Sequence, residues 1–138
     1  FGVKPKVAML SFSNFGTSGE LRTDRIEEAV SIAREIDPDL TIDGPMQADT
    51  ALVPAIQEDY PFMAFDGPAN VLICPNLASA NIAYKLLQRI AGAEMTGPIL
   101  EGLSKPAHVL QRGDSVRDVV HMAAICAVDA QRHARQRL

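Results

Sequence analysis

The side chains best suited to chemistry gather at residues 107–120, AHVLQRGDSVRDVV. This run predicts a short strand at 108–111, a turn that contains glycine, and the start of the last and longest helix. Arg112 falls in the turn and Asp118 in the first turn of the helix. Because the unpaired N–H groups and the dipole of a helix N-terminus favour anions, this placement predicts a site for a phosphorylated or thioester ligand.

Asp118 and Arg89 also have purely structural interpretations. Ser115 and Asp118 have the spacing of a capping box, with Ser115 as N-cap and Asp118 at the third helical position, which would account for Asp118 without catalysis. Arg112 has no comparable explanation, although surface arginines are common. Arg89, late in the third predicted helix, fits a partner for that helix's C-terminal dipole. A ligand site and a structural role both stay open.

Composition limits the classes of function. A chain of 138 residues is most simply one domain, over 1–138, with enough length to bury a core. Its net charge of −4 argues against nucleic-acid or anionic-membrane partners. No apolar run approaches the roughly 18–20 residues that span a bilayer, and no signal peptide is visible, so we expect the cytoplasm. The start at Phe1, without a Met, suggests a fragment of a longer chain.

Metal and disulfide chemistry are not predicted. Cys74 lies in an apolar strand and Cys126 on an apolar helix face, which favours free, buried thiols. The histidines at 108, 121 and 133 are expected on separate elements, so they form no evident ligand pair.

Strands alternate with helices along the chain. Apolar runs predict strands at 6–13, 40–42, 70–74, 98–103 and 108–111. Apolar residues at helical spacing predict four helices. The first ends at Asp37-Pro38, and the second follows a turn at 43–45 and begins with Asp49 as N-cap. The third follows Pro75-Asn76 and ends at Gly92, and the fourth covers 115 to about 132. This order predicts a three-layer α/β fold around a largely parallel sheet.

In such folds, ligands bind in the loops that follow the carboxyl ends of strands. Three loops qualify, at 11–19, 75–81 and 111–118. The first contains Ser11, Ser13 and Gly16 among small hydroxyl residues, but neither a GxGxxG nor a GK[ST] pattern, so it predicts no nucleotide site of those kinds. Its hydroxyl groups could bind phosphate or cap the next helix.

Four stretches resemble the phosphate acetyltransferase (phosphotransacetylase) family. They are VAMLSFSNFGTSGE at 7–20, IDGPMQADTALVP at 42–54, NVLICPNLASANIAYKLLQR at 70–89 and GPILEGLSKPAHVLQRG at 97–113. Within the family, LSFSNFG is most similar to the phosphotransacetylase-like domain at the C-terminus of bacterial NADP-dependent malic enzymes. The resemblance covers only the C-terminal part of the family's length and implies that family's C-terminal subdomain fold.

The resemblance also implies chemistry. The family transfers acetyl between coenzyme A and phosphate, with an aspartate that deprotonates the thiol and an arginine and a serine that stabilise the developing charge. These roles would fall on Asp118 and Arg112, and a second arginine near the CoA phosphates on Arg89. Gln111 replaces the serine. Gln111 and the loop residues Ser11, Ser13 and Gly16 complete the predicted ligand contacts.

Three functions follow from the resemblance. The first is a regulatory and oligomerisation domain of a malic enzyme that binds acetyl-CoA or a related CoA ester, as a dimer or larger homo-oligomer. NADP and a divalent metal would then belong to the preceding malic-enzyme half. The second is an active phosphate acetyltransferase, against which Gln111 argues. The third is an architectural dimerisation domain with a vestigial pocket.

Overall fold

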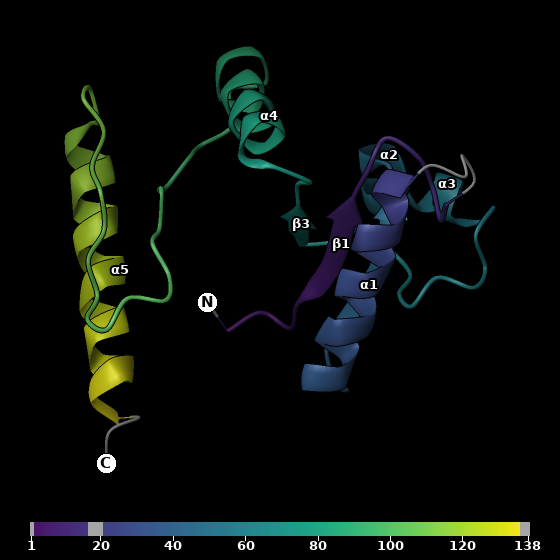
Figure 1. Ribbon diagram of the computed structural model, residues 1–138. Coiled ribbons are helices and arrows are strands. Elements are labelled where there is room, and N and C mark those ends of the chain that lie inside the picture. Colours follow the sequence, from purple (N-terminus) through teal and green to yellow (C-terminus); the bar gives the residue numbers. More distant parts are fainter. Residues whose placement is uncertain (1, 17–20, 136–138) are drawn as a thin grey trace. The chain divides into compact units, whose positions relative to one another are not determined.

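The computed structural model describes residues 2–16 and 21–135, with the backbone alone at 21–23 (Figure 1). The chain divides into two compact units, Phe1–Lys85 and Leu86–Leu138, and each is described by itself. The boundary falls within helix α4 (Leu77–Ile90).

The first unit is built on a parallel sheet. Strands β1 (Lys6–Leu10), β2 (Thr41–Met46) and β3 (Val71–Ile73) lie in the order β2-β1-β3, and β1 pairs in parallel with both neighbours. The predicted α/β class and parallel sheet are confirmed.

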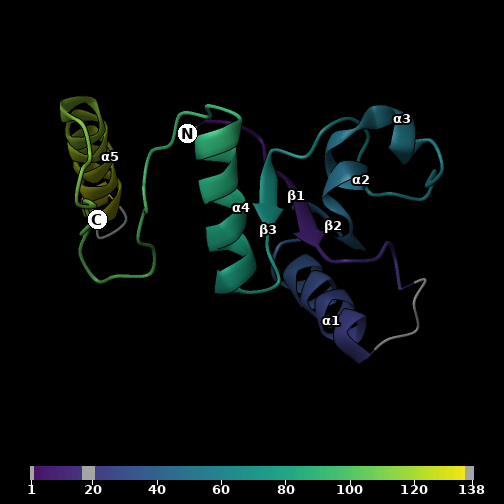
Figure 2. The ribbon, with the colours of Figure 1, turned by 90° about the horizontal axis from the view of Figure 1, so that it is seen from above.

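Helices cover both faces of this sheet because side chains alternate along β1. On one face, Val7 packs with Ile42 and with Val30 of α1 (Leu21–Ile36). On the other, Ala8 packs in a cluster with Met46 and with Ala51 of α2 (Ala48–Leu52). Figure 2 shows α1 and α2 on opposite sides of the strands. The expected three layers are therefore present in this unit.

The predicted turn at 43–45 is wrong, because these residues continue β2. All three are buried, and Gly44 has a φ of 139° that lets the backbone pass close to Met9. Pro45 is tolerated because β2 is an edge strand of the described sheet, where a missing N–H breaks no ladder. Glycine and proline indicate a turn in most sequences, but here the close approach of Gly44 to Met9 of β1 keeps residues 43–45 in the strand.

Replacing Gly44 by alanine is expected to lower the free energy of unfolding by about 2–5 kcal/mol, which combines overpacking and a backbone angle that suits only glycine. A Cβ there would lie 2.5 Å from the carbonyl oxygen of Met9 and 2.8 Å from its Cβ. Urea unfolding measures the change. Gly92→Ala is the matched control, because Gly92 also has a positive φ, of 65°, but open space around it. Equal losses in the two variants would contradict the packing argument.

The helix predicted to begin with Asp49 as N-cap is two helices. Gln47 occupies the N-cap position of α2, and the Asp49 carboxylate accepts from the N–H of Thr50 within the helix. The chain is extended at Val53 and resumes as α3 (Pro54–Gln57). Proline disfavours a helical residue before it and suits the first helical position, so Pro54 ends one helix and starts the next.

The helices predicted near the C-terminus are confirmed. The Asn76 side chain accepts from the N–H of Ser79 at 2.9 Å and caps α4, and Gly92 follows its end with a positive φ. Helix α5 (Val116–Arg135) starts where predicted and runs three residues further.

The strands predicted at 98–103 and 108–111 are wrong. In the described residues, these runs pair with no strand, and an extended chain lies alongside α5 instead (Figures 1 and 2). Pro98 removes a ladder donor from the first run, and the N–H of Leu100 donates to a side chain, His108 Nδ1. The apolar side chains of these runs stay exposed, at 40% for Leu100 and 48% for Val109, so an apolar run does not by itself indicate a strand.

Candidate functional site

Arg112 projects from a tight turn in the second unit. The N–H of Asp114 donates to the carbonyl of Gln111 at 3.2 Å, and Asp114 Oδ2 accepts from the N–H of Gln111 at 2.6 Å. Gly113 has the positive φ of 95° that a type II turn requires at its third position. In the described part of the chain, the exposed Arg112 side chain has no hydrogen bond or ion pair. Its guanidinium is therefore available to an external anion.

The predicted capping box at the start of α5 is confirmed. Asp118 Oδ2 accepts from the N–H of Ser115 at 2.8 Å and from its hydroxyl at 2.7 Å. The N–H of Asp118 lies 3.3 Å from Ser115 Oγ, the reciprocal bond of the motif. One carboxylate oxygen of Asp118 is thus occupied by structural donors.

These bonds lower the pKa of Asp118 below its ordinary value. The Ser115 hydroxyl is the main cause and the Ser115 N–H the second, with smaller effects from His121 and Arg117. Both bonds stabilise the ionised form. A carboxylate with a lowered pKa is a weaker base, which bears on any proton transfer assigned to this residue.

Ser115→Ala is expected to raise the pKa of Asp118 toward its ordinary value, because the hydroxyl that contributes most to the shift is gone. NMR titration of the Asp118 carboxyl measures this. With its lowered pKa, Asp118 stabilises the folded chain above the ordinary value of about 3.9, and this contribution is lost as pH falls through the folded pKa. Ser115→Thr keeps a capping hydroxyl and should titrate as the native protein does. An unchanged Asp118 titration in Ser115→Ala would contradict the assignment.

The other predicted ligand residues of this unit are exposed. Arg89 lies in the last turn of α4, as predicted, without an ion pair in the residues described. The backbone of Gln111 holds the turn, and its side chain is exposed. The structure assigns Arg89, Gln111, Arg112 and Asp118 to one unit.

The predicted loop residues belong to the first unit. Ser13 is buried and Ser11 half-buried, and the N–H of Ser11 donates to the carbonyl of Met46 at 2.8 Å. Gly16 has a φ of 71°, and a side chain there would meet the Glu27 carboxylate. The rest of the predicted loop, at 17–19, lies outside the described residues, so its proposed phosphate or capping role stays a prediction.

Asn14 ties this loop to two other segments. Its Oδ1 accepts from the N–H of Gln47 at 2.7 Å, and its Nδ2 donates to the Tyr60 hydroxyl at 3.1 Å. Phe15, beside it, packs against Tyr60 with 5.2 Å between ring centroids. The described part of the loop after β1 is therefore held firmly in place.

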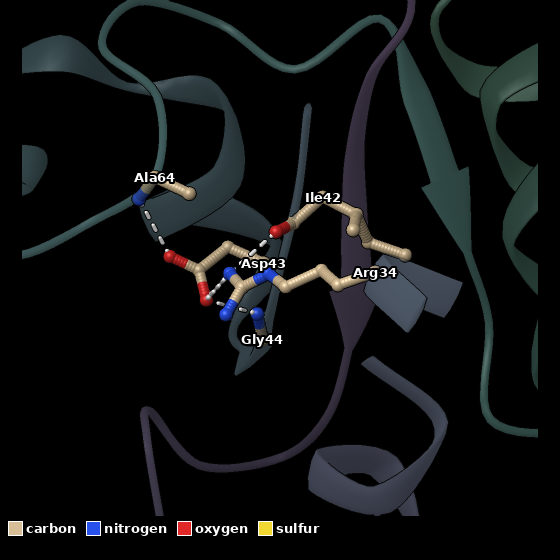
Figure 3. A network of polar contacts seen from close by, with 5 residues as sticks. All are labelled: Arg34, Ile42, Asp43, Gly44 and Ala64. Carbon is tan, nitrogen blue, oxygen red and sulfur yellow. Dashed lines mark hydrogen bonds and ion pairs between the residues drawn. The ribbon is translucent and has the colours of Figure 1, made fainter. Parts of the chain in front are cut away.

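A buried carboxylate at the edge of the sheet was not anticipated. Asp43 accepts from the N–H groups of Gly44 and Ala64 and from Arg34 Nη2, at 2.9, 2.7 and 3.3 Å (Figure 3). Arg34 Nη2 also donates to the carbonyl of Ile42 at 2.7 Å. An open hollow of about 410 Å³ adjoins this network, and Glu27 and Glu35 line it. The carboxylates suit no anionic ligand, and none of the predicted site residues lines the hollow.

The histidines are arranged differently from the prediction. His121 and His133 share α5, because that helix extends beyond 132, and His108 and His133 both approach Asp129. The spacing of Asp129 and His133, four residues apart on a helix, was the available sequence signal. The described residues contain no group of side chains that could hold a metal ion.

Two further predictions concern the cysteines and membranes. Cys74 and Cys126 are free, as predicted, but half-buried rather than buried. None of the described helices is long and apolar enough to cross a membrane.

Comparison with known proteins gives two kinds of relative. The family described as phosphate acetyl/butaryl transferase matches residues 1–127. The phosphate acetyltransferase of Acetivibrio thermocellus is 47% identical over 131 residues, which cover 94% of this chain and 40% of that protein. The NADP-dependent malic enzyme of Salmonella typhimurium is 47% identical over 134 residues, which cover 95% of this chain and 18% of that protein.

Solved structures agree with this. A phosphotransacetylase from Streptococcus pyogenes matches with a TM-score of 0.88 and 42% identity, over 94% of this chain and 40% of that chain. The EutD phosphotransacetylase from Staphylococcus aureus matches with a TM-score of 0.85 and 40% identity, over 94% and 41%. The chain therefore spans about two-fifths of the transacetylases and less than a fifth of the malic enzyme.

Proposed function

The chain belongs to the phosphate acetyl/butaryl transferase family, and from that premise we propose that it is the regulatory domain of an NADP-dependent malic enzyme. In this proposal it binds acetyl-CoA or a related CoA ester, and the ligand alters malate oxidation elsewhere in the same polypeptide. Such control requires a coupling free energy between two sites. Malic enzymes among the relatives support the assignment.

The observation that carries this proposal is the contrast between Arg112 and Asp118. Arg112 is an exposed cation without an ion pair in the described residues, four residues before the first residue of a 20-residue helix. Guanidinium groups suit the phosphate and carbonyl oxygens of a CoA ester. Asp118, in contrast, has one carboxylate oxygen bonded twice to Ser115. In the described residues, Arg112 is therefore available to bind an anion, whereas Asp118, the proposed base, already accepts hydrogen bonds from Ser115.

The state of Asp118 favours binding over turnover. An ordinary aspartate already has a pKa more than four units below the value of about 8.5 for a thiol, and the pKa of Asp118 is lowered further. General-base catalysis is efficient when the pKa of the base lies near the working pH. Gln111 adds to this, because its longer side chain does not place its amide donor where the resemblance implies a serine hydroxyl.

The proposal extends to partners. Gln111 and Arg89 would contribute further ligand contacts in the second unit, and Ser11, Ser13 and Gly16 stay predicted ligand residues of the first. The domain would assemble as a homo-oligomer in the cytoplasm. NADP and a divalent metal would bind elsewhere in the polypeptide, so this domain would need neither.

An active phosphate acetyltransferase is the second candidate, because acetyltransferases are as similar to this chain as malic enzymes are. Two assays on the full-length protein separate the candidates. The regulatory function predicts that acetyl-CoA changes the rate of malate oxidation, and that no phosphate-dependent CoA thiol is released from acetyl-CoA. Release of thiol would favour the transferase, and no response in either assay would favour a purely architectural domain.

A further inference from the structure

His108 is buried between the extended chain and α5. Its side chain is 3% exposed, and Nδ1 accepts from the N–H of Leu100 at 3.3 Å. A neutral histidine that accepts at Nδ1 carries its proton on Nε2. Nε2 is buried without a hydrogen-bond partner among the described residues, and Asp129 Oδ2 on α5 lies 3.6 Å from it. One side chain therefore links two stretches of extended chain to the helix.

Asp129 is shared with a second histidine. His133 Nδ1 lies 3.8 Å from Asp129 Oδ1 and 3.1 Å from the Asp129 carbonyl oxygen, one helical turn away. The Asp129 side chain is 20% exposed, so its negative charge is partly shielded from water and attracts the Nε2–H of His108 more strongly than a surface carboxylate would. The His108–Asp129 contact is thus part of the folded structure of the second unit.

The Arg112 turn lies between this contact and the cap of α5. From Asp129 back to Val116 the helix measures about 20 Å at 1.5 Å per residue. The chain from His108 to Ser115, extended except for the turn, spans about the same distance. The segment is therefore held at both ends, by His108 on Asp129 and by Ser115 on Asp118.

Few other contacts could hold the segment 108–115 in place. Met122, at 5% exposure, is the one buried apolar residue among the described residues of the unit. The Arg117–Glu94 ion pair is short, at 2.7 Å, but its side chains are 61% and 75% exposed, and exposed pairs contribute little.

We propose that His108 is a positioning residue, which fixes the Arg112 turn against α5 through Asp129 and so sets the affinity of the domain for its CoA-ester ligand. This inference rests on the proposed function for its ligand, while the contact itself rests on the geometry. A turn that is held in place only a tenth of the time would bind about tenfold more weakly.

The test uses the full-length protein, with acetyl-CoA as the calorimetric probe and hydrogen exchange of the amides at 98–114 as a second readout. His108→Ala is expected to raise the Kd for acetyl-CoA about tenfold and to speed exchange across this segment. His108→Gln keeps an N–H donor near the position of Nε2, toward Asp129, and should recover most of the affinity. Glu94→Gln breaks the exposed Arg117–Glu94 ion pair without removing a cation from the start of α5, and it should leave the Kd unchanged.

A double variant separates positioning from general damage. If His108 acts through Arg112, then His108→Ala should have no further effect on the Kd in an Arg112→Ala background. Full additivity there, or a native Kd and native exchange in His108→Ala, would overturn the inference. Absence of acetyl-CoA binding by the unsubstituted protein would overturn the proposed function, and the exchange data would still decide whether His108 holds the turn.

Discussion

Gln111→Ser is expected to create phosphate acetyltransferase activity in the full-length protein, at about 10²–10³ times the rate of the unsubstituted protein. The serine hydroxyl would supply a short, fixed donor beside Arg112, and one such donor to a developing oxyanion has about this effect on a rate. Phosphate-dependent release of the CoA thiol from acetyl-CoA measures it.

The matched control is Gln111→Ala, which removes the amide without adding a hydroxyl and should gain nothing. Its turn should persist, because Gln111 forms it through backbone atoms. Thiol release by the unsubstituted protein at the rate of the serine variant would contradict the proposal that Gln111 favours binding over turnover.

Arg112→Ala is expected to weaken acetyl-CoA binding about 10- to 100-fold. Hydrogen bonds to charged groups contribute about 1.5–3 kcal/mol each, and the Arg112 side chain has no described partner within the protein that would compete for it. Calorimetric titration of the full-length protein with acetyl-CoA gives the two dissociation constants.

Two controls sharpen this prediction. Arg112→Lys keeps the charge without the bidentate geometry, so it should fall between the native protein and Arg112→Ala. Arg25→Ala removes an exposed arginine from α1 in the first unit and should bind as the native protein does. A native dissociation constant for Arg112→Ala would show that the ligand, if bound, lies elsewhere.

Local patterns predicted the parts of the fold that local forces decide. The apolar run of β1, the start of α4 after Asn76, the Ser115 cap and the end of α4 at Gly92 each depend on residues within a few positions of one another. The Ser115–Asp118 spacing was sufficient to predict the contacts that the structure contains.

Contacts between distant segments were not predictable in this way. Residues 43–45 read as a turn, and only the approach of Gly44 to Met9 explains why they continue a strand. The runs at 98–103 and 108–111 read as strands, but they pair with no strand in the described residues, and His108 contacts Leu100 and Asp129 instead.

The same distinction applies to the candidate site. Arg112 and Asp118 were found from their positions in a turn and a cap, which are local features. His108 was passed over, because its partners Leu100 and Asp129 are 8 and 21 residues away and nothing in the run around it signals a buried ring. Sequence patterns therefore identify a residue that would bind a ligand, such as Arg112, more readily than a residue that positions it, such as His108.

Hydrogen exchange of the full-length protein, with and without saturating acetyl-CoA, tests whether a CoA ester binds at the Arg112 turn. Binding there is expected to slow exchange at the amides of residues 111–118, because the ligand would restrain the turn and the start of α5. Unchanged exchange at these amides, with protection elsewhere or nowhere, would contradict it.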